Sequence, residues 1–143
     1  MKRFSGAVLL EAITANGIKV GVISDLHTSL DYSASASVDD NCIGSDAFSN
    51  GQEPVGRIGC DPSMKLVDYM FQHFAEVFGS VDVILVTGDS IVHGVAPDLG
   101  EKDLQESWEQ EKSNFEADTN LLKKHFPDTL VLQSLGNNDG LHS

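Results

Sequence analysis

Side chains that can bind metal ions follow three short apolar runs in this sequence. Asp25 and His27 follow the first run, Asp89 follows the second, and Asn137 follows the third. Carboxylate, imidazole and amide groups are oxygen and nitrogen ligands for divalent cations such as zinc, manganese or iron. Each motif alone is a common loop or turn pattern. Together, after three successive runs, they predict metal-assisted chemistry.

The three apolar runs have the composition of buried β-strands, being short and rich in β-branched residues. Helical patterns separate them. The first helix is expected to begin with Asp61 as N-cap and Pro62 in its first turn, and to end at Gly79. The segment 28–60 has no sustained period and is predicted to be a long loop. The predicted strands span residues 18–24, 81–86 and 129–132, and the second helix spans 101–126.

This order of elements predicts an α/β fold with a mainly parallel sheet. Ligands bind beyond the carboxyl ends of the strands in such sheets, which is where the polar motifs lie. The alternation of a strand would place Asp25 and His27 on the same side. Gly88 and Gly136 would allow the tight turns that direct the next residue into a pocket.

Apolar residues at helical spacing predict the faces that each helix buries. On the first helix these are Met64, Val67, Phe71, Phe74 and Phe78, and on the second Leu104, Trp108, Phe115, Leu122 and Phe126. We interpret the Met and aromatic stripe of the first helix as core packing; on the second helix, charged residues fill the positions outside the stripe.

The composition narrows the class of protein. The chain has 143 residues, 41% of them hydrophobic, and a net charge of −13 from 22 acidic and 9 basic residues. Such a charge argues against a nucleic-acid-binding face that neutralises phosphates. No apolar stretch reaches the roughly 18 residues of a transmembrane helix. Residues 1–17 are treated as an N-terminal segment, a weak candidate for a signal remnant because Glu11 interrupts its apolar run, and 18–143 as one domain.

Cys42 and Cys60 flank part of the long loop. From the residues alone they could be two buried thiols. In an oxidising compartment they could instead form a disulfide worth about 3 kcal/mol in the loop-entropy model.

The motifs Asp-x-His, Gly-Asp and Gly-Asn-Asn-Asp, in this order, resemble the calcineurin-like metallophosphoesterase superfamily. Three longer segments resemble one branch of it, the acid sphingomyelinase-like phosphodiesterases and the endopolyphosphatases. These segments are "GRIGCD", "VTGDSIVHG" and "HFPDTLVLQSLGNND". The resemblance implies a β-α-β sheet with flanking helices, of which this chain holds the N-terminal half only, because the family's later Gly-His-x-His ligands are missing. It also implies a Cys42–Cys60 disulfide.

By the same resemblance, two divalent ions would produce a hydroxide that attacks phosphorus. Zinc is favoured over manganese or iron. Asp25 and His27 would hold the first ion, Asp89 would bridge, and Asn137 would hold the second. His93 and Asn138 are the candidate catalytic residues.

Asn138 stands where many members of the family have a His, and an amide cannot act as a general acid. This favours a phosphoanhydride such as polyphosphate, whose leaving group needs little protonation, and leaves His93 as the nearby imidazole. Other substrates to consider are phosphate-containing small molecules and phospholipid head groups. No nucleic-acid binding is expected, and the resemblance favours a secreted protein or one in the vacuolar or lysosomal lumen.

Two other readings compete with a hydrolase. The chain could be a binding or regulatory fragment that retains the front half of the fold, and in either case we expect weak metal binding and little turnover. A response-regulator-like α/β domain with a single magnesium is the third reading, which His27 and the Asn pair fit poorly.

Overall fold

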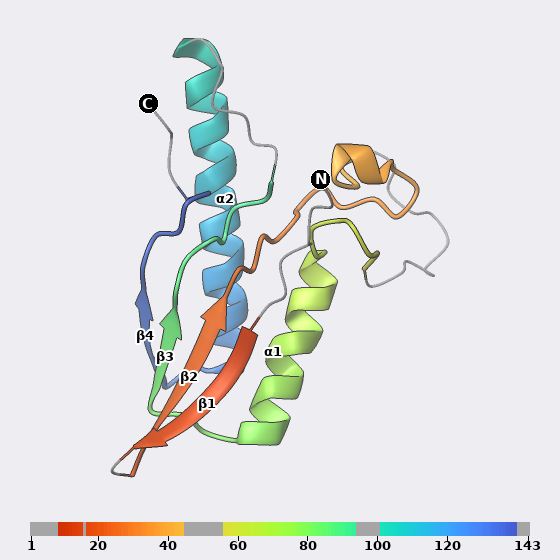
Figure 1. Ribbon diagram of the computed structural model, residues 1–143. Coiled ribbons are helices and arrows are strands. Elements are labelled where there is room, and N and C mark those ends of the chain that lie inside the picture. The colour runs from red at the N-terminus through yellow and green to blue at the C-terminus, as the bar shows by residue number, and fades with distance from the viewer. Residues whose placement is uncertain (1–8, 16, 45–55, 94–100, 140–143) are drawn as a thin grey trace.

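The computed structural model of the chain describes residues 9–15, 17–44, 56–93 and 101–139 (Figure 1). Its strands pair in the order β1-β2-β3-β4, with β2, β3 and β4 parallel. This confirms the predicted α/β fold with a three-stranded parallel sheet. The elements are β1 (Leu9–Ala15), β2 (Ile18–Ser24), a 3₁₀ turn (Val38–Asp40), α1 (Met64–Phe78), β3 (Val83–Val86), α2 (Glu101–His125) and β4 (Leu130–Gln133).

The fourth strand, β1, was not predicted from the sequence. It pairs antiparallel with β2 along its whole length, from Leu9 opposite Ser24 to Ala15 opposite Ile18. The basic start and short apolar run of residues 1–17 are the pattern of an N-terminal segment outside the domain. A strand at the edge of a sheet depends on its partner more than on its own composition, so the single-segment pattern did not reveal it. Residues 1–8 lie outside the described residues.

Helix α1 begins two residues later than the sequence suggested. Ser63, and not Asp61, is the N-cap, because the Ser63 Oγ accepts a hydrogen bond from the N–H of Leu66 at 3.2 Å. Asp61 is therefore free for another partner. The predicted end is confirmed: Gly79 takes a φ of +66° and its N–H donates to the carbonyl of Ala75 at 3.0 Å.

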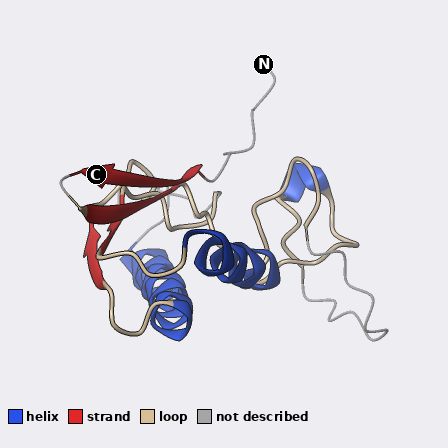
Figure 2. Ribbon diagram, turned by 90° about the horizontal axis from the view of Figure 1, so that it is seen from below, coloured by secondary structure: helices blue, strands red, loops and turns tan. Residues whose placement is uncertain are grey.

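Both helices lie on one face of the sheet and bury a shared core there (Figure 2). Phe74 is 1% exposed and packs edge-on against Phe126, with ring centroids 5.6 Å apart. A Cβ at Gly21 of β2 would lie 2.9 Å from the Phe74 ring, so the glycine makes room for this side chain. The core cluster consists of Ile23, Leu26, Val67, Phe71, Phe74, Val81, Ile84, Val86, Leu121, Leu122 and Phe126.

The other face of the parallel strands is also apolar. Strand alternation directs Val20, Val22, Val83 and Leu85 to that face, together with two residues of β4. Those two, Leu130 and Leu132, are 57% and 51% exposed. In the described part of the chain no helix covers this face (Figure 2). The sheet thus has the two apolar faces typical of parallel strands, with one of them open.

The predicted apolar stripe on α2 is only partly correct. Leu122 and Phe126 are in the core, but Trp108 is 53% exposed. In the turns of α2 that precede Leu121, the buried residues are polar and include Asn114 and Asp118. The physical reason is position, because these turns of the helix pack against the loop that follows β2 and not against the sheet. Among the described helices, none is long and apolar enough to cross a membrane.

Removing the Phe74 ring should destabilise the fold strongly. Phe74→Ala should lower the free energy of unfolding by about 3–5 kcal/mol, because it leaves a cavity between the helices and Gly21. Urea denaturation followed by circular dichroism measures this. The control is Tyr69→Ala on the same helix, where the side chain is 50% exposed. That change should stay within about 0.5 kcal/mol of the parent, and equal losses in both variants would contradict the assigned core.

Candidate metal centre

Main-chain pairing between β2 and β3 continues past the ends of both strands. The N–H of Asp25 donates to the carbonyl of Gly88 at 3.2 Å, and the N–H of His27 donates to the carbonyl of Asp89 at 2.9 Å. Thr28 N–H continues the series to the carbonyl of Ser90 at 3.2 Å. The two loops therefore run side by side, and the ligand-type residues of one lie next to those of the other.

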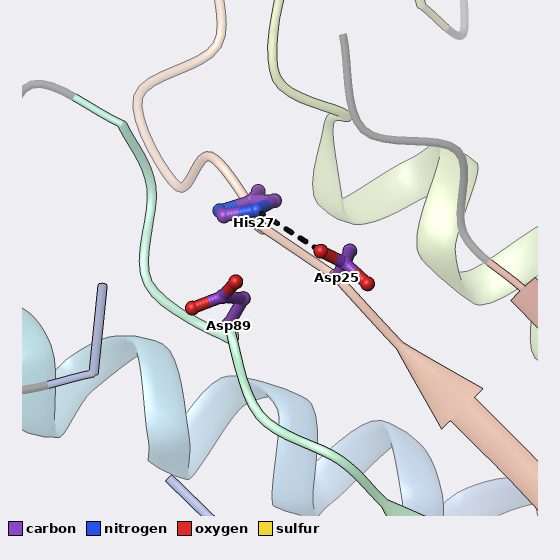
Figure 3. Close-up of side chains that lie close together, drawn as sticks. All are labelled: Asp25, His27 and Asp89. Atoms are coloured by element: carbon purple, nitrogen blue, oxygen red, sulfur yellow. Dashed lines mark ion pairs between the residues drawn. The ribbon is translucent and has the colours of Figure 1, made fainter. Parts of the chain in front are cut away.

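Asp25, His27 and Asp89 come together at this edge of the sheet (Figure 3). Each offers one ligand atom, and these atoms lie within 4.8 Å of one another. His27 is buried, whereas the Asp25 side chain is 40% exposed, so the group opens toward solvent on one side. Two carboxylates and an imidazole at this separation suit a divalent cation.

All three residues have a left-handed backbone. Their φ angles are +56° for Asp25, +42° for His27 and +56° for Asp89. This conformation is uncommon for residues other than glycine and costs on the order of 1–3 kcal/mol each when the surroundings impose it. Asp tolerates it best, and His better than most. Three such residues in one ligand group indicate that the loops are shaped to present side chains.

The orientation of His27 leaves one ring nitrogen for a metal. Its Nδ1 lies 2.8 Å from the carbonyl oxygen of Ile91, which can only accept, so Nδ1 carries the proton. In the neutral ring Nε2 is then the nitrogen with a free lone pair, and it faces Asp25, whose Oδ1 is 4.0 Å away. Metal-binding histidines are commonly oriented by a backbone carbonyl in this way.

The tips of β3 and β4 touch at two glycines. A Cβ on Gly88 would lie 2.2 Å from the Gly136 nitrogen, and a Cβ on Gly136 would overlap the Asp89 side chain. Gly88 also has a φ of +108°, which favours glycine on its own. Both positions were expected to be turn glycines. The structure gives a further reason for Gly136, which is the close approach of the two tips.

Asp139 is the residue that joins these tips, and the sequence did not reveal its role. Its carboxylate is buried and accepts four main-chain hydrogen bonds. The donors are the N–H groups of Asp89 (2.5 Å), Ser90 (2.7 Å), Ile91 (3.1 Å) and Gly136 (2.8 Å). In the sequence it is one residue of an Asn-Asp-Gly turn signal, which points to local contacts and not to partners 50 residues away.

The two asparagines beside it have different environments. The main-chain N–H of Asn138 donates to the Asp89 Oδ1 at 2.8 Å, which fixes the carboxylate expected to bridge two ions. Asn137 is exposed, and among the described residues its side chain makes no hydrogen bond. Asn137 precedes Asn138 in the chain, and no hydrogen bond within the described residues uses its amide oxygen. Residues 140–143, which include His142, lie outside the described residues.

Helix α2 supports the loop of Asp25 and His27 from behind. Asp118 accepts a hydrogen bond from the Thr28 hydroxyl at 2.6 Å, and the Asn114 amide donates to the Thr28 carbonyl at 2.6 Å. Burial raises the pKa of Asp118 to about 7, the Thr28 hydroxyl opposes this shift, and the nearby Asp139 adds to it. The second carboxylate oxygen of Asp118 and the Asn114 Oδ1 have no partner in the described part of the chain.

His93 lies directly on the ligand group. Its ring stacks on that of His27, with centroids 3.9 Å apart and planes inclined by 26°. The Asp61 carboxylate holds it, with Oδ1 2.7 Å from the His93 Nδ1. The sequence indicated His93 by its distance from Asp89, but not the pairing with Asp61, which it had placed at a helix start. His73 and His125 are on helices; His125 pairs with Asp68 at 2.6 Å, away from this group.

Comparison with known proteins identifies similar sequences over most of the chain, although no family profile matches it. It is 33% identical over 124 residues to sphingomyelin phosphodiesterase A of Dictyostelium discoideum, covering 82% of this chain and 19% of that protein. It is 34% identical to acid sphingomyelinase-like phosphodiesterase 3b of Mus musculus, covering 82% and 24%. It is 28% identical to an endopolyphosphatase of Schizosaccharomyces pombe, covering 82% and 22%. The chain thus spans about a fifth to a quarter of the length of these relatives.

Asp139→Asn should loosen the junction of the β3 and β4 tips. An amide offers one acceptor oxygen and turns an NH₂ group toward main-chain donors, so some of the four N–H groups lose their partner. We expect the free energy of unfolding to fall by about 2 kcal/mol or more. Denaturant unfolding measures the loss. Asp128→Asn, at an exposed position before β4, is the matched control and should change little. An equal, small effect for both would argue against the junction.

Asp118 should give the metal-free protein a distinct pH dependence. The unfolded chain releases this proton near the ordinary value of 3.8, whereas the folded chain keeps it to about pH 7. The stability that the protonated carboxyl contributes is therefore complete below about pH 4 and is lost as the pH rises to about 7. The Asp118→Asn side chain is always neutral. The free energy of unfolding of this variant, relative to that of the parent, should therefore rise by on the order of 2–4 kcal/mol between about pH 4 and about pH 7.

Denaturant unfolding of both proteins in the presence of chelator, at half-unit pH steps, tests this prediction. The measured quantity is the difference in the free energy of unfolding between variant and parent. Glu116→Gln, exposed on the same helix, is the control and should give a flat difference. A flat difference for Asp118→Asn as well would show that the carboxyl is ionised in the folded protein.

Proposed function

Since the chain is related over most of its length to the acid sphingomyelinase-like phosphodiesterases and endopolyphosphatases, we propose that it is part of a metal-dependent hydrolase of phosphoesters or phosphoanhydrides. The observation that carries the proposal is the gathering of Asp25, His27 and Asp89 at the carboxyl ends of two parallel strands, with ligand atoms within 4.8 Å. The names of the proteins that this chain resembles identify hydrolases of phosphate compounds. A site of this kind is where an α/β sheet places its ligands.

The donor set fits the divalent ions that this chemistry needs. His27 and Asp25 would hold a first ion, Asp89 would bridge, and Asn137 would hold a second, with zinc favoured over manganese or iron. Such ions, when bound, polarise the phosphate and lower the pKa of water. The protein's part is to keep the ligands in place: the Ile91 carbonyl orients His27, and the Asn138 N–H orients Asp89. With a net charge of −13, the surface itself would not attract a phosphate.

His93 and Asn138 are the residues proposed to act on the substrate. The His93 imidazole lies against His27 and could donate a proton to the leaving oxygen. Asn138 could donate a hydrogen bond through its amide but not a proton. We therefore place a phosphoanhydride such as polyphosphate ahead of a lipid diester as substrate. The Cys42–Cys60 disulfide supports an oxidising compartment, either secreted or vacuolar/lysosomal.

The second candidate is metal or phosphate binding without turnover. It is favoured by the small ligand group, because in the described residues only Asp25, His27 and Asp89 form a cluster of carboxylate and imidazole ligands. Catalytic dinuclear sites need more ligands than these three and one amide to hold two ions tightly.

Metal analysis joined to an activity assay separates the two candidates. The chain is loaded with zinc or manganese and dialysed, its metal content is measured, and hydrolysis of bis-p-nitrophenyl phosphate and polyphosphate is followed. Asp89→Ala should lower both metal occupancy and turnover by more than about 100-fold, since loss of a supporting residue alone costs 10–100-fold. Asp128→Ala, an exposed carboxylate outside the site, should leave both unchanged. Stoichiometric metal without turnover would favour the binding role, and no metal at all would refute both the hydrolase function and metal binding.

A further inference from the structure

The segment that follows the long loop supplies the support of His93. Both oxygens of the Asp61 carboxylate are used: Oδ1 lies 2.7 Å from the His93 Nδ1, and Oδ2 accepts the His93 main-chain N–H at 2.7 Å. Asp61 is 8% exposed, whereas the His93 side chain is 39% exposed, so the carboxylate is buried and the ring opens partly to solvent. One carboxylate thus fixes both the backbone and the ring of the same residue.

A second residue holds His93 from the opposite end of its backbone. The side-chain amide of Asn41 donates to the His93 carbonyl at 3.1 Å. Asn41 has a φ of +52°, and its own N–H donates to the carbonyl of Val38 at 3.2 Å, so its position is set by the 3₁₀ turn. His93 is therefore bound at its N–H, its carbonyl and its ring.

The two residues that hold His93 are neighbours of the two cysteines. Asn41 precedes Cys42, Asp61 follows Cys60, and the disulfide joins these cysteines across 18 positions. Cys42 is fully buried. The Pro62 carbonyl also accepts the Ser29 N–H at 2.8 Å, which ties this segment to the loop that follows His27. The disulfide therefore closes a clamp, defined here as Asn41, Cys42, Cys60 and Asp61, around the histidine next to the metal ligands.

This arrangement decides which nitrogen of His93 can face a substrate. A buried carboxylate accepts, so the His93 Nδ1 carries its proton and only Nε2 remains for another partner. A carboxylate in this position holds an imidazole in one tautomer and orientation, as in the serine protease triad. In the imidazolium form the His93 Nε2 also carries a proton. As the oxygen of a water molecule bonds to phosphorus, the bond from phosphorus to the leaving oxygen breaks, its electron pair stays on that oxygen, and that oxygen takes the Nε2 proton. The imidazole that remains is neutral and still bonded to Asp61.

We infer that Asp61 is a positioning residue of the hydrolytic site, and that the Cys42–Cys60 disulfide keeps Asp61 and Asn41 in place around His93. This inference rests on the proposed hydrolase function for its catalytic consequence, but not for its geometry. The "GCD" segment therefore does more than close a loop. Its disulfide keeps in place the residues that orient His93, the proposed proton donor.

The geometry is tested first, without any substrate. In the intact, oxidised chain, ¹⁵N-labelled histidine is observed by two-bond ¹H–¹⁵N correlation, with His93 assigned by its loss in His93→Gln. We expect a single His93 pattern with Nδ1 protonated and a slowly exchanging Nδ1 proton. Asp61→Asn should lose this proton signal and give an averaged pattern, and so should the double variant Cys42→Ser/Cys60→Ser. Asp39→Asn, an exposed neighbour in the 3₁₀ turn, should match the parent.

The catalytic consequence is tested by the leaving group. Aryl phosphodiesters that release phenol need a proton more than those that release p-nitrophenol, and general acid catalysis is worth about 100–10,000-fold. Asp61→Asn should lower kcat for the phenyl substrate at least about tenfold more than kcat for the p-nitrophenyl substrate, with KM nearly unchanged. The comparison of two substrates is needed because a loss of folded protein would lower kcat for both of them equally.

Three outcomes decide the matter. A parent chain in which His93 already lacks a fixed Nδ1 proton overturns the inference, and this needs no variant to fold. Equal losses for both leaving groups also overturn it. A fixed pattern in the parent that is lost in Asp61→Asn supports the clamp even if the parent shows no turnover, a result that would refute the hydrolase function alone.

Discussion

The buried carboxylate of Asp139 is the contact on which the site depends. It joins the ends of β3 and β4 by accepting main-chain hydrogen bonds from both, at a point where two glycines bring the backbones into contact. Without an acceptor here, several N–H groups would be buried with no partner, which is costly. With it, Asp89 and Ile91 have fixed positions, and the Ile91 carbonyl can in turn orient His27. The contact that joins the two strand ends thus also places the ligand group.

Support for the ligand loops comes from both sides. From α2, Asn114 and Asp118 hold Thr28 by its carbonyl and its hydroxyl. On the other side, the clamp holds His93, whose ring lies on His27. Polar residues therefore line the inner surface around the loops, where apolar side chains would be usual. Proteins commonly tolerate such local costs at functional sites, where precise placement of a few side chains matters more than packing.

The sequence predicted those features that depend on short-range patterns. Each parallel strand is an apolar run, and the residue after each run is polar, so the α/β fold and the positions of Asp25, His27 and Asp89 could be derived from local composition. The contacts that connect distant segments could not. Asp139 looks like a turn residue, Asp61 looks like a helix cap, and Asp118 looks like one more acid on a charged helix. Nothing in their immediate neighbours shows that each has a partner about 30 to 90 residues away.

The left-handed backbone at Asp25, His27 and Asp89 has a consequence for how an ion would enter. The chain has already given up the conformational entropy of these residues on folding, and main-chain hydrogen bonds keep them there. An arriving cation would meet ordered ligands instead of having to gather them. Its uptake would then require little rearrangement of the backbone at these three residues.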